Sequence, residues 1–264
     1  MKIYAIIIAA SLIAGEIHSQ EPLTDSLAMK LLQLEYSVQE EESACMKQNL
    51  ILQKAKTLSV AGRYHESLLE LQRIDPGSML NTTELYYERA LCFFLSGDHN
   101  QSYNEMLGIP DSTICNTLKY QRLWLLNLSE AGKFEECKNR LLERENLTEN
   151  QKKKIDSLPV TFRFRSPLKA SELSAFMPGS GQIYSGYTGK GIISILLHAG
   201  TGYIAVAGFM SGIYIVPTVF GVYPLLRFYI GGQIMSENLA RRKNLENEED
   251  LKTLYNEIIF LVCK

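Results

Sequence analysis

The sequence predicts an all-α protein in which helical repeats precede a two-helix transmembrane hairpin and a C-terminal amphipathic helix. One observation is the absence of Asp, Glu, Lys and Arg from residues 191–226, whereas a helix needs only about 20 apolar residues to cross a bilayer. The other is a short phrase that recurs at a constant interval between helical patterns within residues 24–160. The two patterns divide the chain into a helical domain and a membrane module.

Residues 1–19 have the pattern of a secretory signal peptide. Lys2 precedes an apolar run over residues 3–15, and Ser19 offers a small residue at the cleavage point. Ile17 is large where a small residue is usual, so an uncleaved anchor is an alternative. We expect the signal peptide to direct the rest of the chain to export.

Three variants of one phrase mark the helical domain. Gly62, Gly97 and Gly132 recur every 35 residues, each followed two positions later by a ring-bearing residue and five positions later by Ser or Cys. Glycine relaxes the turn, the ring packs between two helices, and the small residue allows their close approach. The phrase therefore predicts helix-turn-helix units, and its charged members, such as Asp98, are expected to contribute little to stability.

Helical patterns flank each phrase, with apolar residues at i, i+3 and i+4. Asn81 followed by Glu84 has the form of a capping box. Residues 26–36 look like a half repeat at the start of the array. The flanking apolar patterns occupy residues 50–55, 68–71, 86–94, 103–107, 120–128 and 141–142.

This domain resembles the tetratricopeptide repeat family over roughly residues 24–150. The family usually binds peptides or partner proteins on a concave face, so the resemblance implies a protein partner and an adaptor role. Leu125 occupies a position where the family usually has a small residue, and the third repeat lacks a terminal proline. A plain exported helical domain is the alternative, and no individual binding residue is carried over.

The membrane module begins with a short helix at the interface. Ser166 is a good N-cap, Pro167 suits the first helical position, and Pro178-Gly179 ends the helix. A hairpin is expected to follow, with spans over residues 191–209 and 213–230 that turn at residues 210–212. In this way residues 166–232 form an interfacial helix plus the hairpin, whose backbone bonds are satisfied within lipid.

This module resembles a bacterial membrane-domain family of unknown function that is related to the TM-two hairpin domains and often follows a signal peptide and tetratricopeptide-like repeats. The resemblance covers residues 166–257 and implies the architecture, but no activity. The residues that carry it are Pro178, Gly179, Gly181, Gln182, Tyr184, Gly186 and Gly191, with the sequence 226–232 after the hairpin.

Arg227 is the one basic residue expected inside the spans. Counted from the turn, it lies at nearly the same depth as Ser194 and His198, either of which would satisfy it. An interfacial anchor is the favoured interpretation, and a polar pathway or lipid-headgroup site is the alternative. The C-terminal segment 233–264 is expected to be a helix, with an apolar stripe that covers the repeats or a partner. That stripe comprises Leu251, Leu254, Tyr255, Ile258, Ile259 and Val262.

Orientation is set by two opposing signals. The signal peptide and two spans place both soluble ends outside the cytoplasm, whereas the positive-inside rule favours the reverse, because basic residues flank the spans and none lies at the turn. The signal peptide acts first, so we expect a bacterial inner-membrane protein with the repeats and C-terminus in the periplasm. The flanking basic residues are Arg163, Arg165, Lys169, Lys190, Arg241, Arg242 and Lys243.

Composition argues against several functions. The net charge is −2 without a basic stripe, so nucleic acid is not an expected partner. The five cysteines are scattered, and no spacing predicts a metal site, a cofactor site or a catalytic group. We therefore expect a non-enzymatic membrane-anchored adaptor or scaffold that recruits an envelope protein and rests in the lipid bilayer. A subunit of a transport or lipid-handling assembly is the alternative, and the sequence indicates no oligomeric state.

Overall fold

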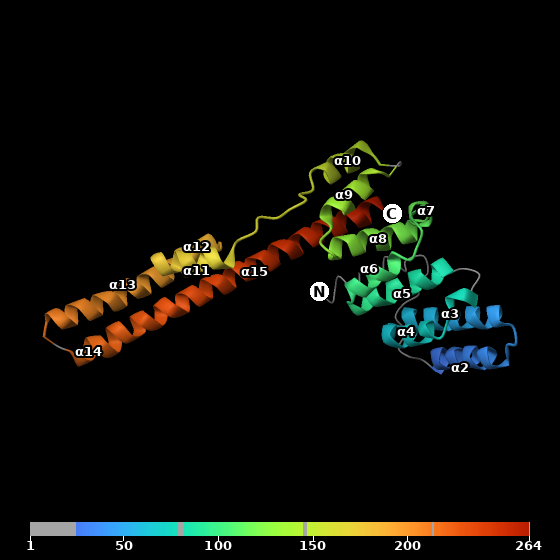
Figure 1. Ribbon diagram of the computed structural model, residues 1–264, viewed down its shortest axis with the longest axis horizontal. Coiled ribbons are helices and arrows are strands. Elements are labelled where there is room, and N and C mark those ends of the chain that lie inside the picture. Colours follow the sequence, from blue (N-terminus) through green and yellow to red (C-terminus); the bar gives the residue numbers. More distant parts are fainter. Residues whose placement is uncertain (1–24, 79–81, 145–146, 213, 264) are drawn as a thin grey trace. The chain divides into compact units, whose positions relative to one another are not determined.

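The computed structural model describes residues 25–78, 82–144, 147–212 and 214–263. Within these ranges the chain is helical and has no strand, which confirms the all-α class (Figure 1). The predicted signal peptide and Asn81 lie outside the described residues. The chain forms two compact units: unit 1 comprises residues 1–160 and 254–264, and unit 2 comprises residues 161–253.

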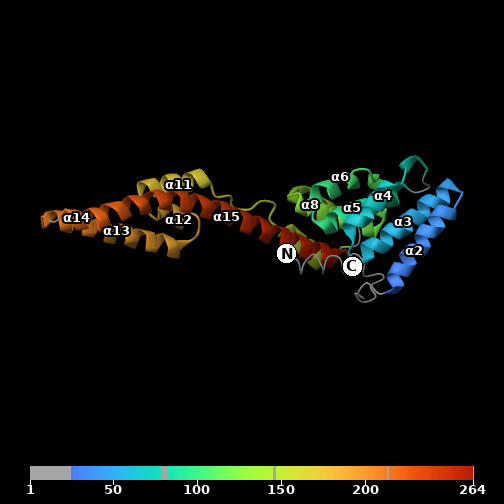
Figure 2. The same ribbon diagram turned by 90° about the horizontal axis from the view of Figure 1, so that it is seen from below.

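Unit 1 consists of helices that pack in chain order. From α2 to α6, each helix packs against the next, and α8 packs on both α6 and α9 (Figure 2). The elements are α2 (Asp25–Glu40), α3 (Ala44–Val60), α4 (Tyr64–Gln72), the 3-10 turn η1 (Pro76–Ser78), α5 (Thr82–Ser96), α6 (His99–Met106), α7 (Asp111–Asn116), α8 (Leu118–Glu130), α9 (Phe134–Leu142) and α10 (Glu149–Asp156).

The three phrase glycines adopt the same backbone conformation. Gly62, Gly97 and Gly132 have φ of 78°, 92° and 71°, the left-handed region that glycine enters without steric cost. Each glycine amide donates to the carbonyl three residues earlier, and the next amide donates to the carbonyl five residues earlier. This pair of bonds ends α3, α5 and α8 in the same way and turns the chain into the following helix.

The small residue of each phrase also makes an equivalent contact. The hydroxyl of Ser67 donates to the Ala55 carbonyl at 2.7 Å, and that of Ser102 donates to the Ala90 carbonyl at 2.7 Å. The thiol of Cys137 lies 3.6 Å from the Leu125 carbonyl. A larger side chain would separate the paired helices at these points, so the contact accounts for the Ser or Cys of the phrase.

A charged cluster joins α3, α5 and α8. Glu84 on α5 accepts hydrogen bonds from Lys56 at 2.7 Å, from Lys119 at 2.8 Å and from the Tyr120 hydroxyl at 2.8 Å. Burial favours the neutral acid, but the hydrogen bonds from Lys119, Lys56 and Tyr120 prevail and lower the pKa of Glu84 to about 2. The carboxylate is therefore ionised at neutral pH and holds the first helices of three pairs together.

The C-terminal end of α15 contributes to the core of unit 1. Tyr255, Ile259 and Cys263 are fully buried, and the Tyr255 ring lies 5.1 Å from that of Phe134. This agrees with the expectation that the apolar stripe covers the helical domain. Leu254, however, is exposed, because it lies one residue, and so about 100° of helix rotation, away from the buried side.

Unit 2 contains α11 (Pro167–Phe176), α12 (Ser180–Tyr184), α13 (Thr188–Met210), α14 (Ile215–Pro217), the π-helical segment η2 (Thr218–Val222) and the first part of α15 (Tyr223–Val262). The Ser166 hydroxyl accepts from the Lys169 amide at 3.3 Å, and Pro167 begins α11, both as expected. In the described part of the chain, α13 and the segment from Ile215 onward are long and apolar enough to cross a membrane.

Two features of unit 2 differ from the expectation. The helix does not end at residue 232, because α15 continues through the charged segment to Val262. The second apolar segment also begins as α14 and a π-helical segment instead of a regular helix. Pro224 has no amide hydrogen and cannot donate to the Phe220 carbonyl, which favours this local irregularity.

Asp98 corrects one expectation of the sequence analysis. Its carboxylate accepts from the Gln101 amide at 3.1 Å and caps α6, so it contributes more than its surface position suggested. Loss of such a cap costs about 1 kcal/mol. The spacing of three residues from Asp98 to Gln101 indicates this helix cap in the sequence. The other two phrases have no such signal, because Arg63 and Lys133 occupy the equivalent position.

We predict that Gly97→Val destabilises unit 1 more than Asp98→Ala does. A Cβ at Gly97 meets no atom within 4 Å, so the cost comes from the φ of 92°, which is worst for a β-branched residue. Gly97→Asn is the control, because Asn tolerates this region. Thermal unfolding followed by the emission of Trp124, the single tryptophan, gives the order. Equal melting temperatures for Gly97→Val and Asp98→Ala would contradict this order, and equal values for Gly97→Val and Gly97→Asn would show that the backbone conformation is not the cause.

Candidate functional site

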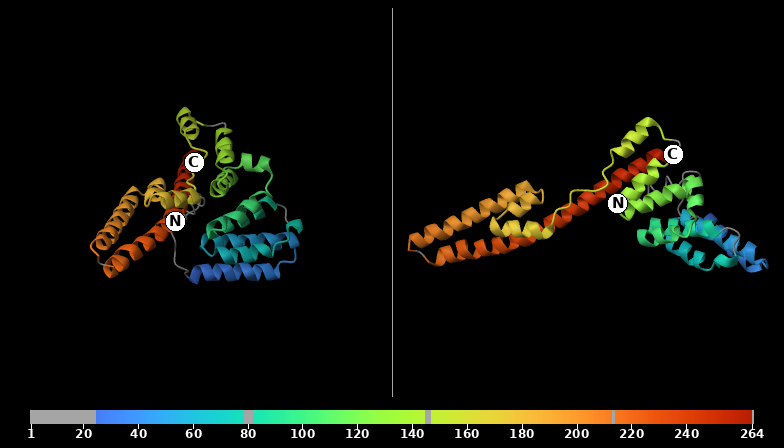
Figure 3. Two further views of the ribbon diagram at one scale, coloured as in Figure 1. Left: turned by 60° about the vertical axis from the view of Figure 1, so that its left-hand side comes forward. Right: turned by 45° about the horizontal axis from the view of Figure 1, so that its top comes forward.

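The expected motif residues gather in unit 2, where α11, α12 and the start of α13 meet α15. The right-hand view of Figure 3 shows α11 and α12 beside α15 at the beginning of α13. We call this region the glycine junction. It comprises residues 178–191 and four residues around them. Arg165, Ala170 and Ser236 lie against this segment, and Asn244 holds Arg165.

Glycines allow backbone segments to touch in the junction. A Cβ on Gly181 would lie 1.8 Å from the Ala170 carbonyl oxygen, so α12 crosses α11 at a distance that only glycine permits. Gly179 has a φ of 91°, and its Cβ would lie 2.4 Å from the Gly191 carbonyl oxygen. A Cβ on Gly191 would in turn lie 2.7 Å from the Gly179 oxygen. These approaches explain three glycines of the motif.

Arg165 occupies the space beside a fourth glycine. Gly186 has a φ of 89°, and a Cβ there would lie 2.7 Å from the guanidinium of Arg165. That guanidinium donates to the Tyr184 carbonyl, and the Tyr184 hydroxyl accepts from the Ser166 amide at 3.2 Å. Tyr184 is thereby bound at both ends to the segment that enters α11.

Asn244 holds the same segment from α15. Its Oδ1 accepts from the Arg165 amide at 2.8 Å, and its Nδ2 donates to the Arg165 carbonyl at 2.8 Å. The buried amide group thus satisfies both backbone groups of one residue, as a neighbouring β-strand would. This pair fixes the entry to α11 at a single turn of α15.

Buried hydroxyl groups complete the junction. The Ser236 hydroxyl lies 2.8 Å from the Gln233 carbonyl of its own helix and 3.1 Å from the Ala170 carbonyl. The Ser185 hydroxyl likewise lies 2.8 Å from the Gly181 carbonyl and 3.1 Å from the Ser236 carbonyl. Gln182 is buried, and within the described residues its Oε1 has no hydrogen-bond partner; the same holds for the Ser174 hydroxyl. The junction is therefore polar inside as well as closely packed.

Charged and aromatic side chains form the rim. The Tyr187 hydroxyl donates to Glu246 at 3.1 Å, and Arg242 and Lys243 pair with the same carboxylate at 3.0 and 3.2 Å. Lys190 lies 5.1 Å above the Tyr187 ring. Cations beside tyrosine rings next to an apolar helix are typical of the boundary between hydrocarbon and headgroups.

The structure thus brings together Gly179, Gly181, Gln182, Tyr184 and Gly186, and Pro178 follows the end of α11. Arg227 lies elsewhere. Its side chain is exposed. The neighbours of His198 and Ser194 on α15 are other residues: the His198 ring lies 6.3 Å from the Phe228 ring, and the Ser194 hydroxyl lies 3.9 Å from the place of a Cβ on Gly232. The expected pairing of Arg227 with these residues is wrong, because equal depth does not place side chains on facing sides of two helices.

Sequence reasoning missed the contribution of Arg165, Ser236 and Asn244. Arg165 was counted only as a flanking charge, and Asn244 stands among charged residues that suggest solvent exposure. The sequence does contain one signal of a close helix contact. Small or amide side chains recur at intervals of four along one side of the helix, at Ser236, Ala240 and Asn244.

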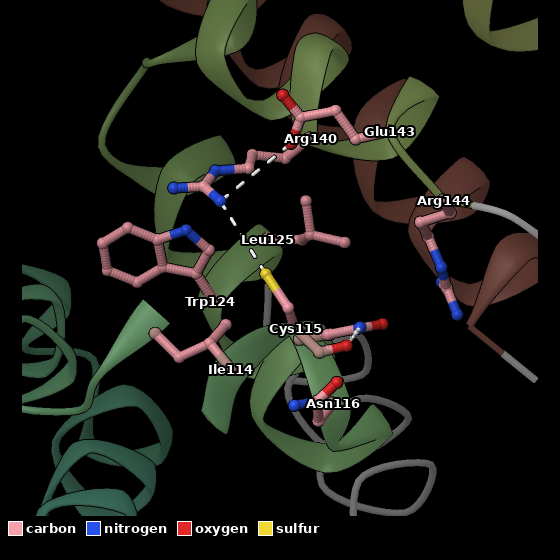
Figure 4. Close-up of a pocket in the computed structure, with 9 residues that line it drawn as sticks. Ile114, Cys115, Asn116, Trp124, Leu125, Arg140, Glu143 and Arg144 are labelled. Atoms are coloured by element: carbon pink, nitrogen blue, oxygen red, sulfur yellow. Dashed lines mark hydrogen bonds and ion pairs between the residues drawn. The ribbon is translucent and has the colours of Figure 1, made fainter. Parts of the chain in front are cut away.

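The arrangement is suited to holding helices together. Within the described residues no cluster of three His, Cys, Asp or Glu side chains could hold a metal ion. A separate cleft of about 340 Å³ lies in unit 1, where α7, α8 and α9 place Cys115, Trp124 and Arg140 around it, and Arg144 follows the end of α9 (Figure 4). This cleft and the glycine junction are the two candidate sites.

We predict that Gly181→Ala destabilises unit 2, whereas Gly189→Ala does not. Both glycines lie in helices, where Ala is intrinsically favoured, but only Gly181 lacks room for a Cβ. Overpacking against a backbone oxygen should cost about 1–3 kcal/mol. Thermal denaturation of the full chain in detergent measures the difference. A Gly181→Ala variant as stable as Gly189→Ala would show that the close crossing does not support the fold.

Comparison with known proteins gives no relative from which a role could be transferred. No protein-family model matches the chain, and neither a curated protein nor a solved structure matches it significantly.

Proposed function

We propose that this chain is a non-enzymatic, membrane-anchored adaptor that recruits an envelope protein through helical repeats. The observation that carries the proposal is the threefold recurrence of one turn in unit 1, with the same glycine conformation, backbone bonds and Ser or Cys contact at each occurrence. Repeated helix pairs that stack on their neighbours form extended surfaces suited to binding other proteins. A tetratricopeptide-like array is therefore the interpretation we favour for residues 24–160.

The anchor in this proposal is a transmembrane hairpin in unit 2. Gly208 and Gly221 bring α13 close to the returning chain. A Cβ on Gly208 would lie 2.7 Å from Pro217, and a Cβ on Gly221 would lie 2.7 Å from Ala205. The outward side chains of α13 are apolar and would be covered by the bilayer. The exposed apolar side chains on this helix include Ile192, Ile193, Leu196, Leu197, Tyr203, Ile204, Val206 and Phe209.

The glycine junction would then lie at the membrane boundary. Leu168 and Phe176 of α11 and the following Met177 are exposed, and Phe176 is 92% accessible, which favours insertion of this side of α11 into the interface. The polar rim with Lys190 and Tyr187 would reach the headgroups. The architecture fits the resemblance to the bacterial membrane-domain family with the PGxGQxYxG motif, and it supplies that motif with a packing role.

The transport alternative has less support. It depended on a polar group formed by Arg227, Ser194 and His198 within the spans, and these side chains do not meet. An exposed arginine near the end of an apolar segment is better suited to anchoring, because its long side chain carries the charge to the headgroups. We therefore retain the adaptor as the proposed function.

We predict that unit 1 contacts a protein in the membrane-bound state. A photo-crosslinking residue placed at Tyr36, Val60 or Leu107, all exposed, should give an adduct of discrete mass from at least one position. The same residue at Leu196 or Val206, exposed on α13, is the control and should give no such adduct, because lipid surrounds it. Discrete adducts from the α13 positions alone would contradict the adaptor and favour a membrane assembly.

We also predict that both soluble ends lie in the periplasm of a bacterial inner-membrane protein. Reporter fusions at Asn150 and at Lys264 should both behave as exported, since the signal peptide acts before the hairpin inserts. Cytoplasmic behaviour at both positions would show that the flanking positive charges determine the topology.

A further inference from the structure

We propose that the cleft between α8 and α9 binds an acidic side chain, flanked by apolar residues, on a peptide segment of a partner protein. The inference rests on the proposed adaptor function and assigns a binding site and ligand chemistry to it. The cleft lies wholly within unit 1, and its volume of about 340 Å³ is within the range of pockets that hold a small ligand or a few side chains.

The first supporting observation is a buried donor without an acceptor. Trp124 is 6% exposed, and its Nε1 has no hydrogen-bond partner within the described residues. A buried donor without an acceptor is unfavourable, so a ligand acceptor that enters beside the ring, once the lining side chains move to admit it, would remove this cost. The ring stacks on Tyr103 at 5.2 Å, which fixes its orientation. Figure 4 shows the indole nitrogen on the edge that faces the Arg140 guanidinium.

The second observation is a positive charge that is only loosely compensated. Arg140 lies 3.3 Å from Asp111 and 4.0 Å from Glu143, and both carboxylates are about two-thirds or more exposed, so these pairs are weak. Arg144 donates to the Cys263 sulfur at 2.6 Å. Burial raises the pKa of Cys263, so its thiol is neutral and gives Arg144 no counter-charge. Two guanidinium groups and one indole N–H therefore border a single cleft, whose lining also includes one carboxylate, that of Glu143, and the side-chain amides of Asn116 and Gln121.

The lining distinguishes between anions. Ile114, Leu125 and the Trp124 ring make one part of the cleft apolar, which suits side chains next to the anion. The planar guanidinium fork matches the two oxygens of a carboxylate, and the indole N–H supplies a further donor. A carboxylate on an otherwise apolar peptide satisfies both parts of the lining, whereas a free phosphate would leave the apolar part in contact with water.

Emission of Trp124 tests the proposal directly, because it is the only tryptophan. Full chain in detergent is titrated with acetyl-Leu-Glu-Leu-amide, with acetyl-Leu-Gln-Leu-amide and with inorganic phosphate. We expect a saturable change in emission with the Glu peptide and at least about tenfold weaker binding of the Gln peptide, because a charge-assisted contact is stronger than one between neutral groups. Equal binding of the two peptides, or tighter binding of phosphate than of the Glu peptide, would overturn the assignment.

Two variants separate the cleft from the rest of unit 1. Arg140→Gln should weaken binding of the Glu peptide about tenfold, while Arg63→Gln, which removes an arginine from a surface pair with Glu66, should leave it unchanged. Trp124→Phe keeps an apolar ring and removes the N–H, and anisotropy of a labelled Glu peptide should show weaker binding. If Arg140→Gln does not fold, the Trp124→Phe result decides. Wild-type affinity in a folded Arg140→Gln or in Trp124→Phe would refute the proposal.

The same variants distinguish failure of the cleft from failure of the adaptor function. One outcome is that the wild-type chain binds no peptide, while photo-crosslinking from unit 1 still occurs in the Arg140→Gln variant. In that case the adaptor function stands and the cleft assignment is wrong. If the Glu peptide binds with the expected selectivity but no crosslink forms from unit 1, the cleft stands and the adaptor function fails.

Discussion

The contact between Gly181 and the Ala170 carbonyl is the constraint on which the packing of unit 2 depends. With no side chain at Gly181, α12 lies against the backbone of α11, and the Ser185 and Ser236 hydroxyls can then reach neighbouring carbonyl groups. The Gly179–Gly191 approach repeats this solution at the start of α13. Small residues at crossings allow the backbones of two helices to approach closely.

Unit 1 uses charge in two different ways. Glu84 is surrounded by Lys56, Lys119 and Tyr120, and this mutual satisfaction leaves little to offer a ligand. Arg140, by contrast, pairs only with the exposed carboxylates of Asp111 and Glu143, at 3.3 and 4.0 Å, and it lies near a buried indole N–H that lacks an acceptor. The first arrangement stabilises helix packing, and the second leaves interactions that a bound anion would complete.

Features with a local physical cause were predictable from the sequence. The phrase glycines were expected to need conformational freedom and do have positive φ, and Ser166 and Pro167 do begin α11. Features that depend on distant partners were not predictable. Arg165 and Asn244 are 79 positions apart, and neither has an unusual neighbour in sequence. The Arg227 expectation was wrong because counting residues from a turn gives depth but not direction around the helix. The Trp124 cleft arises from three helices and has no sequence signature.

The paired hydrogen bonds between Asn244 and Arg165 make the helical phase of α15 matter as much as its composition. Each residue added to a helix rotates everything after it by about 100° and advances it by about 1.5 Å. Ser236 and Asn244 both bind the segment around α11, so a single-residue insertion or deletion between them would turn one of the two away from its acceptor. The exposed positions between them, such as Arg241 and Arg242, can vary in identity. Their number is fixed, and this part of α15 acts as a spacer of defined length.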